Sequence, residues 1–510
     1  MPSFRGEHGC RNAASDCSRR QTALLSSAGT GPMQNDIQLT ERVTGEELTR
    51  RRFLTMAAAV ASLPQLEWAS NLSVPAVRVR IVQNDLEIAP QHVVRTAMYE
   101  FDGGNVIELP QGLPIPVEIQ NTLNTEEWIH WHGMRVPSRW DGTDTESSVP
   151  VPAGGMLRYM LPPQQPGLFY VHSHAMTCHD MTRGLYSGQF SPVYVRPHKD
   201  PGDYDQEIFW TSHEWEPHMV NAADEERSME EMQHLRIDPE DGDDSDGWDI
   251  RYRIASVNGR ALGHGEPIRV KEGERVLFHF VNASATENIE IALPGHSFQV
   301  VAMDGSPVPQ RASVPVLTLG VGERIDALVL MAAPGVWILG STDPQVRVLG
   351  LGSVVEYAGR TGQPVWSDAP AAVWDYATFS QMGSMQAGEE LQMNVERLPL
   401  AADGSERWEL VLRDRMGRLH HGAFRTGQPY RLRLQNNSDE WHPMHLHRHR
   451  FEVIRYAGKD IAGLTKDTVL LPPWDRVDLL LTLRDTGRAL FHCHNQMHME
   501  AGLQMLFHVT

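Results

Sequence analysis

The sequence predicts an all-β fold made of three consecutive β-sandwich domains. Three observations predict it: a unit that occurs three times along the chain, alternation of apolar and polar residues with period 2, and frequent Gly, Pro and Asn between the alternating segments. Successive side chains of a strand point to opposite faces of its sheet, so this alternation is typical of strands with one buried face. Many short strands separated by turn residues are typical of β-sandwiches.

The repeated unit contains two recognisable segments. The first begins with Gly and ends with Asn nine residues later, as in GLPIPVEIQN (112–121), GERVLFHFVN (273–282) and GQPYRLRLQN (427–436). The second has Gly before an apolar run, as in GLFYVHSH (167–174), GVWILGST (335–342) and GRALFHCH (487–494). We therefore expect domains at 75–200, 201–365 and 366–510, after an N-terminal extension of residues 1–74.

Histidine pairs occupy matching positions in the first and third repeats. They follow the pattern His-X-His and are His130/His132, His172/His174, His445/His447 and His492/His494. The middle repeat has Ile291/Leu293 and Gly340/Thr342 at these positions, so we expect no metal ligands in it. A related histidine of the middle repeat, His296, is expected to mark a structural turn.

The pairs predict a metal cluster. Residues at i and i+2 of a strand project to one face, so eight imidazoles can converge if the outer domains pack face to face. Eight are too many for one ion and suit three metals. Ligation by nitrogen alone favours copper, zinc, iron or nickel over magnesium or calcium.

Cys493 lies between His492 and His494 and is expected to point to the opposite face of its strand. It would therefore bind a different metal, adjacent to the cluster, together with His442 and His498. Two histidines and one thiolate form the ligand set of a blue-copper electron-transfer centre. Leu503 is expected at the axial position, with Met505 as the alternative. An electron would then need to cross only the peptide bonds from Cys493 to His492 or His494.

Charge and the N-terminal residues suggest partners and location. A formal net charge of −20 disfavours nucleic acid as a partner. TRRRFL (49–54) precedes a short apolar run and resembles a twin-arginine export signal, which implies the export machinery as a partner and a periplasmic or secreted protein. A chance basic patch is the alternative. The acidic run at 238–247 is expected to be a solvated loop, and no later segment is predicted to span a membrane.

In residues 75–510 the chain resembles the multicopper oxidases of the laccase-like and copper-resistance type, which have three Greek-key cupredoxin domains. Four motifs carry the resemblance: HWHG (130–133), HSH (172–174), HPMHLH (442–447) and HCHNQMH (492–498). The resemblance implies four copper ions. It assigns a type 1 copper to His442, Cys493 and His498, a type 2 copper to His130 and His445, and a type 3 pair to His132, His172, His174, His447, His492 and His494.

The resemblance also implies a reaction. One-electron oxidation of phenols or aromatic amines at the type 1 copper would be coupled to four-electron reduction of dioxygen to water at the trinuclear cluster. Asp141, in WDG, matches an acidic residue that relays protons, although a turn residue is the alternative. Oxidation of Cu(I) in the periplasm for copper tolerance is the alternative function. A non-enzymatic exported scaffold is disfavoured because all ten histidines and Cys493 are present.

Several positions depart from the family pattern, among them Tyr170 and Val171, which replace the common Trp-Tyr before HSH. Arg448 stands where Gly is usual, Met499 replaces an acidic residue that often follows the last type 1 histidine, and Cys178 stands where Gln is common. We expect Cys178 to be a buried thiol. None of these departures removes a ligand, but they concern the proton pathway and the substrate pocket.

Overall fold

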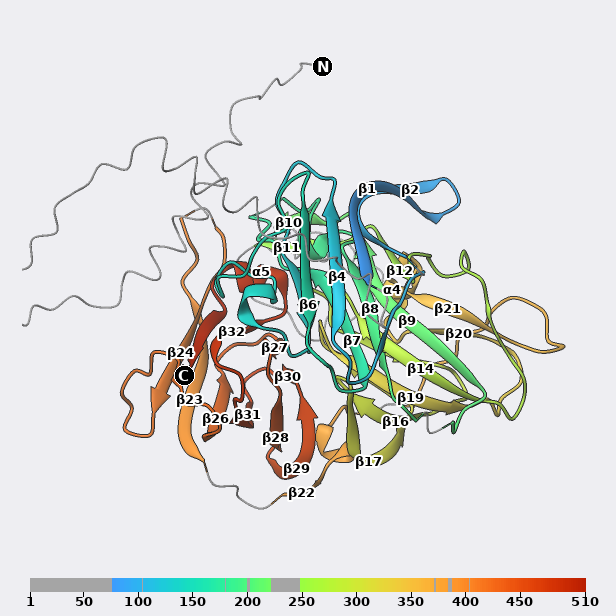
Figure 1. Ribbon diagram of the computed structural model, residues 1–510. Helices are drawn as coiled ribbons and strands as arrows, with labels where there is room; N and C mark the ends of the chain where they lie inside the picture. The colour runs from blue at the N-terminus through green and yellow to red at the C-terminus, as the bar shows by residue number, and fades with distance from the viewer. Residues whose placement is uncertain are drawn as a thin grey trace, which may run out of the picture. The chain divides into compact units, whose positions relative to one another are not determined.

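The computed structural model describes residues 76–102, 104–178, 180–199, 202–221, 248–370, 373–383, 388–402 and 404–510. Nearly all the regular structure in these residues is β, which confirms the predicted fold class (Figure 1). The proposed export signal and the acidic run at 238–247 lie outside the described residues.

Residues 77–196 form two four-stranded sheets. The first has the order β2-β1-β4-β6 and contains β1 (Val77–Ala89), β2 (His92–Phe101), β4 (Ile115–Asn121) and β6 (Met156–Leu161). The second has the order β3-β8-β7-β5 and contains β3 (Ile107–Pro110), β5 (Ile129–His132), β7 (Gly167–Ser173) and β8 (Phe190–Arg196). Two short 3-10 helices, η1 (Ser138–Trp140) and η2 (Gly184–Tyr186), lie in the connections.

Residues 206–357 form the next group of sheets. The larger has the order β12-β9-β14-β19-β16-β17 and contains β9 (Gln206–Trp215), β12 (Ile254–Val257), β14 (Arg275–Asn282), β16 (Phe298–Met303), β17 (Ser306–Val314) and β19 (Arg324–Leu330). The second has the order β13-β21-β20-β15-β18 and contains β13 (Ile268–Val270), β15 (Ile289–Ala292), β18 (Val316–Leu319), β20 (Val336–Ser341) and β21 (Gly352–Tyr357). The remaining elements are β10 (His218–Asn221), β11 (Trp248–Arg251) and the helix α4 (Pro344–Leu349).

Residues 376–509 form the last group. One sheet has the order β22-β29-β28-β31-β26-β23-β24 and contains β22 (Gln381–Met382), β23 (Glu389–Leu398), β24 (Arg407–Asp414), β26 (Pro429–Asn436), β28 (Phe451–Tyr456), β29 (Lys459–Lys466) and β31 (Arg476–Thr482). The other has the order β25-β33-β32-β27-β30 and contains β25 (Ala423–Phe424), β27 (His442–Leu446), β30 (Thr468–Leu471), β32 (Gly487–Cys493) and β33 (Gln504–Val509). The helices are η4 (Tyr376–Phe379) and α5 (Gln496–Glu500).

The three repeats have the same strand connectivity. The strand that ends in the repeat asparagine is β4, β14 or β26. It pairs in parallel with the earlier strand β1, β9 or β23, and antiparallel with the later strand β6, β19 or β31. Three consecutive sandwiches therefore follow the repeats found in the sequence.

The repeat asparagines explain why the segments end as they do. Asn121, Asn282 and Asn436 are buried, and each side-chain amide donates to two backbone carbonyls, one a few residues downstream and one at least 30 residues away. Each asparagine thus joins two loops at one end of its sandwich. Burying an amide is favourable only when its hydrogen bonds are made, which accounts for the residue type.

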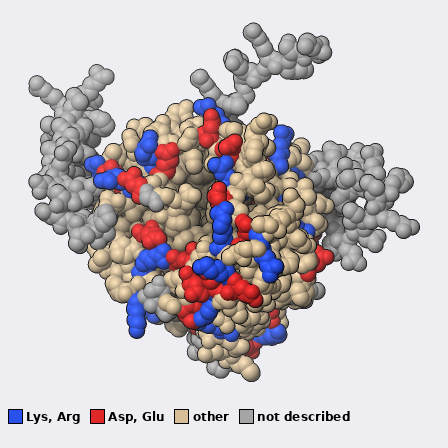
Figure 2. Space-filling model, turned by 90° about the vertical axis from the view of Figure 1, so that its right-hand side faces the viewer, with Lys and Arg blue, Asp and Glu red and all other residues tan. Residues whose placement is uncertain are grey.

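Residues 76–510 form one compact unit with an extensive apolar core. On the face in Figure 2, acidic and basic side chains lie next to one another, with no large basic patch. Within the residues that the structure describes, no helix has both the length and the apolar composition needed to cross a bilayer.

Candidate metal centre

Strands β27 and β32 place the histidines and the cysteine of the last sheet on opposite faces. In their antiparallel register His445 lies opposite His492, and Met444 lies opposite Cys493. Residues directly opposite each other point to the same face. His445 and His492 therefore share one face, while the Cys493 thiol points to the other, as the alternation in the sequence predicts.

Strands β5 and β7 make the matching arrangement in the first group. His130 pairs with His172, and Ile129 pairs with Ser173. The backbone N–H of His174 donates to the Trp128 carbonyl at 2.7 Å, which holds this last histidine beside the end of β7.

The eight histidines of the four pairs converge between the two groups. The His130 ring stacks on His447 with centroids 3.8 Å apart, His132 stacks on His445 at 3.7 Å, and the His174 and His492 centroids lie 5.3 Å apart. All eight are buried. The predicted face-to-face approach of the outer repeats thus brings the pairs together.

The outer nitrogens of these rings are held by acceptors. Nδ1 of His130, His172, His445 and His492 lies 2.7–2.9 Å from the backbone carbonyls of Asp141, Ser173, Asp467 and Cys493. A carbonyl only accepts, so each Nδ1 carries the proton and leaves Nε2 with a free lone pair. Nε2 of His130, His172, His174 and His445 is buried with no hydrogen-bond partner.

A metal site requires buried ring nitrogens with free lone pairs, such as these Nε2 atoms. Unpaired buried polar atoms are rare in folded proteins unless they serve a function or bind an ion. Several groups of three ligand atoms could hold an ion, among them His130/His445/His447, His130/His132/His172 and His174/His447/His492. Neutral imidazole nitrogen in this number suits copper, so the residues fit the metal that the sequence suggests.

Burial keeps the imidazoles neutral. Desolvation lowers the pKa of all eight, to about 3 for His172 and about 4 for His174. Neighbouring histidines lower most of them further, since two adjacent imidazolium ions would repel each other.

The cysteine group lies directly behind this cluster. Sγ of Cys493 is 3.7 Å from Nδ1 of His442 and 3.6 Å from Nδ1 of His498, and the two nitrogens are 3.2 Å apart. Asn495 caps α5 by accepting from the N–H groups of Met497 and His498, which fixes His498 one turn after Cys493. The predicted trio is therefore brought together, and Cys493 is a buried free thiol.

One outer edge of this trio, at His498, reaches a partly exposed residue. Nε2 of His442 is 2.9 Å from Ser438 Oγ, and Nε2 of His498 is 2.8 Å from the Glu440 carboxylate, which is 22% exposed. Neither partner is among the residues predicted from the sequence. Their only sequence signal is their position immediately before His442.

Asp141 is buried and not an exposed turn residue. Its Oδ2 lies 2.9 Å from Nδ1 of His447, and the Glu146 carboxylate lies 3.2 Å from the same nitrogen. Burial raises the pKa of both carboxyl groups, and their proximity raises that of Glu146 further. Glu146 has no counterpart among the sequence predictions.

Two departures from the family pattern have structural outcomes. Arg448 adopts φ +64°, the left-handed region that favours glycine, and its guanidinium donates to the carbonyls of Val136, Thr486 and Arg488. The prediction for Cys178 was wrong, because this residue is half-buried and disulfide-bonded.

His296 is structural, as expected. Its ring nitrogens lie 2.8 Å from the Pro294 carbonyl and 2.6 Å from the Tyr357 hydroxyl, so neither is free for a metal.

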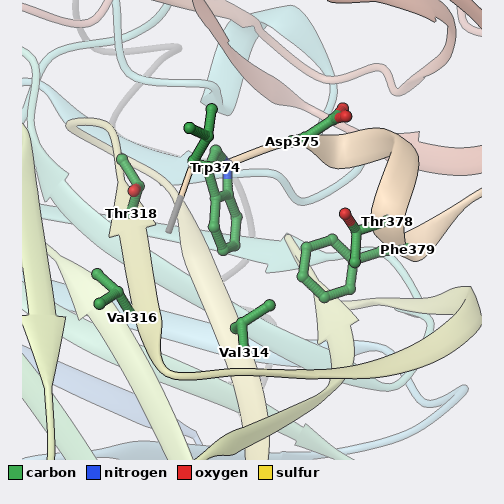
Figure 3. A pocket seen from close by; sticks show the side chains of 8 residues that line it. Val314, Val316, Thr318, Trp374, Asp375, Thr378 and Phe379 are labelled. Carbon is green, nitrogen blue, oxygen red and sulfur yellow. The ribbon is translucent and has the colours of Figure 1, made fainter. Parts of the chain in front are cut away.

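A pocket beside η4 does not belong to the histidine site. Figure 3 shows Val314, Val316, Thr318, Trp374 and Phe379 around it, with Asp375 at its edge. None of its lining residues is a histidine or a cysteine.

Comparison with known proteins identifies the family. Models of multicopper oxidases match residues 90–200, 233–348 and 400–510. The chain belongs to the multicopper oxidase family. It is therefore an oxidoreductase that uses copper.

Several relatives of this multicopper oxidase are known. Multicopper oxidase MmcO of Mycobacterium tuberculosis is 29% identical over 78% of this chain and 80% of its own. Laccase-2 of Botryotinia fuckeliana is 23% identical over 82% of this chain and 80% of its own. Copper resistance protein A of Pseudomonas syringae pv. tomato is 26% identical over 55% of this chain and 52% of its own. A solved multicopper oxidase from Pseudomonas thermotolerans covers 86% of this chain and 99% of its own, with TM-score 0.63 and 22% identity.

Proposed function

We propose that this multicopper oxidase holds four copper ions in two adjoining sites. His442, Cys493 and His498 would bind the type 1 copper. The other three ions would lie among the eight clustered histidines, with His130 and His445 on the type 2 copper and His132, His172, His174, His447, His492 and His494 on the type 3 pair. Domains at 75–200, 201–365 and 366–510 form part of the same proposal.

One observation carries this proposal. The thiol of Cys493 lies in one group of ligand atoms, while its direct neighbours His492 and His494 lie among the clustered histidines. Copper bound there would take single electrons from a donor and supply the four that reduce dioxygen to water. The chain's part is to orient the ligands, exclude water by burial, and hold protons at Asp141 and Glu146 beside His447.

We propose phenols or aromatic amines as the electron donors. Both outer ring nitrogens of the type 1 histidines have polar partners, Ser438 and Glu440, and Glu440 is partly exposed. A carboxylate at that edge can accept a hydrogen bond from a phenolic O–H or an amine N–H.

Cu(I) is the second candidate donor. The names of relatives such as copper resistance protein A favour it, and a carboxylate at the same edge could also attract a cation. Under either function we propose export by the twin-arginine route to the periplasm or outside the cell.

The test compares two donors and one variant. Oxygen uptake by copper-loaded protein should be faster with a phenol than with Cu(I); the reverse ranking would favour the second candidate.

Cys493→Ser should abolish both the intense visible absorption of thiolate-bound copper and turnover, while the far-UV circular dichroism stays unchanged. Full activity in Cys493→Ser would contradict the assignment of the electron-accepting site.

A further inference from the structure

Among the residues that the structure describes, the middle repeat has no candidate copper ligand, yet one of its loops contacts candidate ligands of both outer repeats. The loop Gly320–Arg324 comprises the connection between β18 and β19 together with Arg324, the first residue of β19. Asn282 holds it: the Asn282 amide donates to the Leu319 carbonyl at 3.1 Å, and the Gly322 N–H donates to the Asn282 carbonyl at 3.0 Å.

Gly322 packs directly on two rings of the cluster. A Cβ placed on Gly322 would lie 2.9 Å from Cδ2 of His494, closer than real Cβ atoms come to another atom, and 3.1 Å from Cε1 of His132, which is tighter than most Cβ contacts. Its φ of +83° also favours glycine. The absence of a side chain here lets the loop form one wall of the site.

Arg324, at the end of the loop, is fully buried and makes a bidentate pair with Asp467 at 2.6 and 2.7 Å. Asp467 Oδ1 in turn lies 3.2 Å from Nε2 of His132, and Thr468 Oγ1 lies 3.0 Å from the same nitrogen. The other ring nitrogen, Nδ1, is 3.1 Å from Nε2 of His494.

These contacts determine which nitrogen of His132 faces the cluster. A proton on Nε2, donated towards Asp467 or Thr468, leaves Nδ1 with a free lone pair. Nδ1 of His445 donates to the Asp467 backbone carbonyl at 2.9 Å, and the carboxylate oxygen Oδ1 of Asp467 lies 3.7 Å from the same nitrogen. Because Asp467 touches histidines from both outer repeats, whatever orients Asp467 orients both.

We propose that the loop Gly320–Arg324 of the middle repeat is a positioning element of the copper cluster. Arg324 orients Asp467 and, through it, His132 and His445. Gly322 leaves the space that the rings of His132 and His494 occupy. This inference rests on the proposed copper sites. The middle repeat is then part of the metal centre and not only a spacer between the outer repeats.

The test measures how easily a chelator removes copper, in two matched pairs of variants. Arg324→Met is compared with Arg431→Met, which breaks another buried Arg–Asp pair, Arg431–Asp478 at 2.7 Å, that touches no candidate ligand. Gly322→Ala is compared with Gly273→Ala, which also has a positive φ, +87°, but no atom within 4 Å of an added Cβ.

We expect Arg324→Met and Gly322→Ala to lose cluster copper at roughly 10- to 100-fold lower chelator concentration than their controls, the range known for partners that orient metal ligands. The visible absorption of the Cys493 site should stay unchanged. The electron paramagnetic resonance signal of the cluster copper should shift in these two variants only.

The outcomes separate this inference from the proposed function. If wild-type protein binds copper and each variant matches its control in copper retention and spectrum, the positioning role is wrong and the copper sites stand. If wild-type protein binds no copper, the proposed function and this inference both fail.

Discussion

At the scale of single residues, Leu503 is a buried neighbour of the Cys493 thiol. The Cys493 N–H donates to the Leu503 carbonyl at 3.0 Å, and the next pair along the strands is His492 opposite Gln504. Leu503 therefore shares the face of the thiol and is fully buried. Leucine offers no donor atom, so His442, Cys493 and His498 would hold a copper there without a thioether from position 503.

We predict that Leu503→Met lowers the reduction potential of this copper by tens of millivolts, because a thioether stabilises the cupric state and axial ligands tune such sites. The measurement is a redox titration of the visible band. Leu479→Met, at another fully buried leucine in β31, is the control for the change in side-chain shape. Equal potentials in the two variants would mean that residue 503 does not reach the metal.

At the scale of elements, an ionic cluster joins strands of the first and second repeats. His279 in β14 lies opposite Asp326 in β19, and its ring nitrogens are 2.7 Å from Asp326 and 3.0 Å from Glu207 of β9. Glu207 also pairs with Arg196 of β8, and the Tyr194 and Phe209 rings flank the imidazole. Burial alone would lower the pKa of His279, but the two carboxylates raise it to about 9.

This cluster predicts a stability that falls in mild alkali. The pKa of His279 is higher in the folded protein than in the unfolded chain. The ion pairs of the charged His279 therefore stabilise the fold fully below about pH 6.5, and this stabilisation disappears as pH rises towards about 9. At 1.36 kcal/mol per pKa unit, the charged His279 contributes about 3 kcal/mol to the free energy of unfolding.

Denaturant unfolding between pH 6 and 9.5 should show His279→Gln destabilised by about that amount at pH 6 and close to wild type at pH 9.5. His296→Gln is the control, because burial lowers the pKa of that histidine. A destabilisation by His279→Gln that is constant across this range would rule out a charged His279.

The same scale shows what could be predicted from the sequence. Alternation along β5, β7, β27 and β32 is a local property, so the four histidine pairs and the opposite direction of Cys493 followed from it. Partners such as Glu440, Glu146 and Arg324 come from loops or from another repeat, and no period links them to the ligands. Arg448 likewise could not be interpreted, because its left-handed backbone and its three carbonyl acceptors depend on tertiary contacts.

At the scale of the whole molecule, three copies of one sandwich have divergent roles around a single centre. The first repeat contributes four histidines and Asp141, and the third contributes four histidines and the Cys493 trio. The middle repeat contributes the loop at Gly322 and Arg324. Because the candidate ligand atoms come from the first and third repeats, copper bound to the native state alone would stabilise the packing of these two repeats.

X-ray diffraction from crystals of copper-loaded protein, recorded on both sides of the copper absorption edge, tests the central claim most directly. We predict one copper-specific peak between Cys493 Sγ and the Nδ1 atoms of His442 and His498, and three peaks among the eight clustered histidines. Copper peaks only at surface residues, or none at these two groups, would contradict the claim.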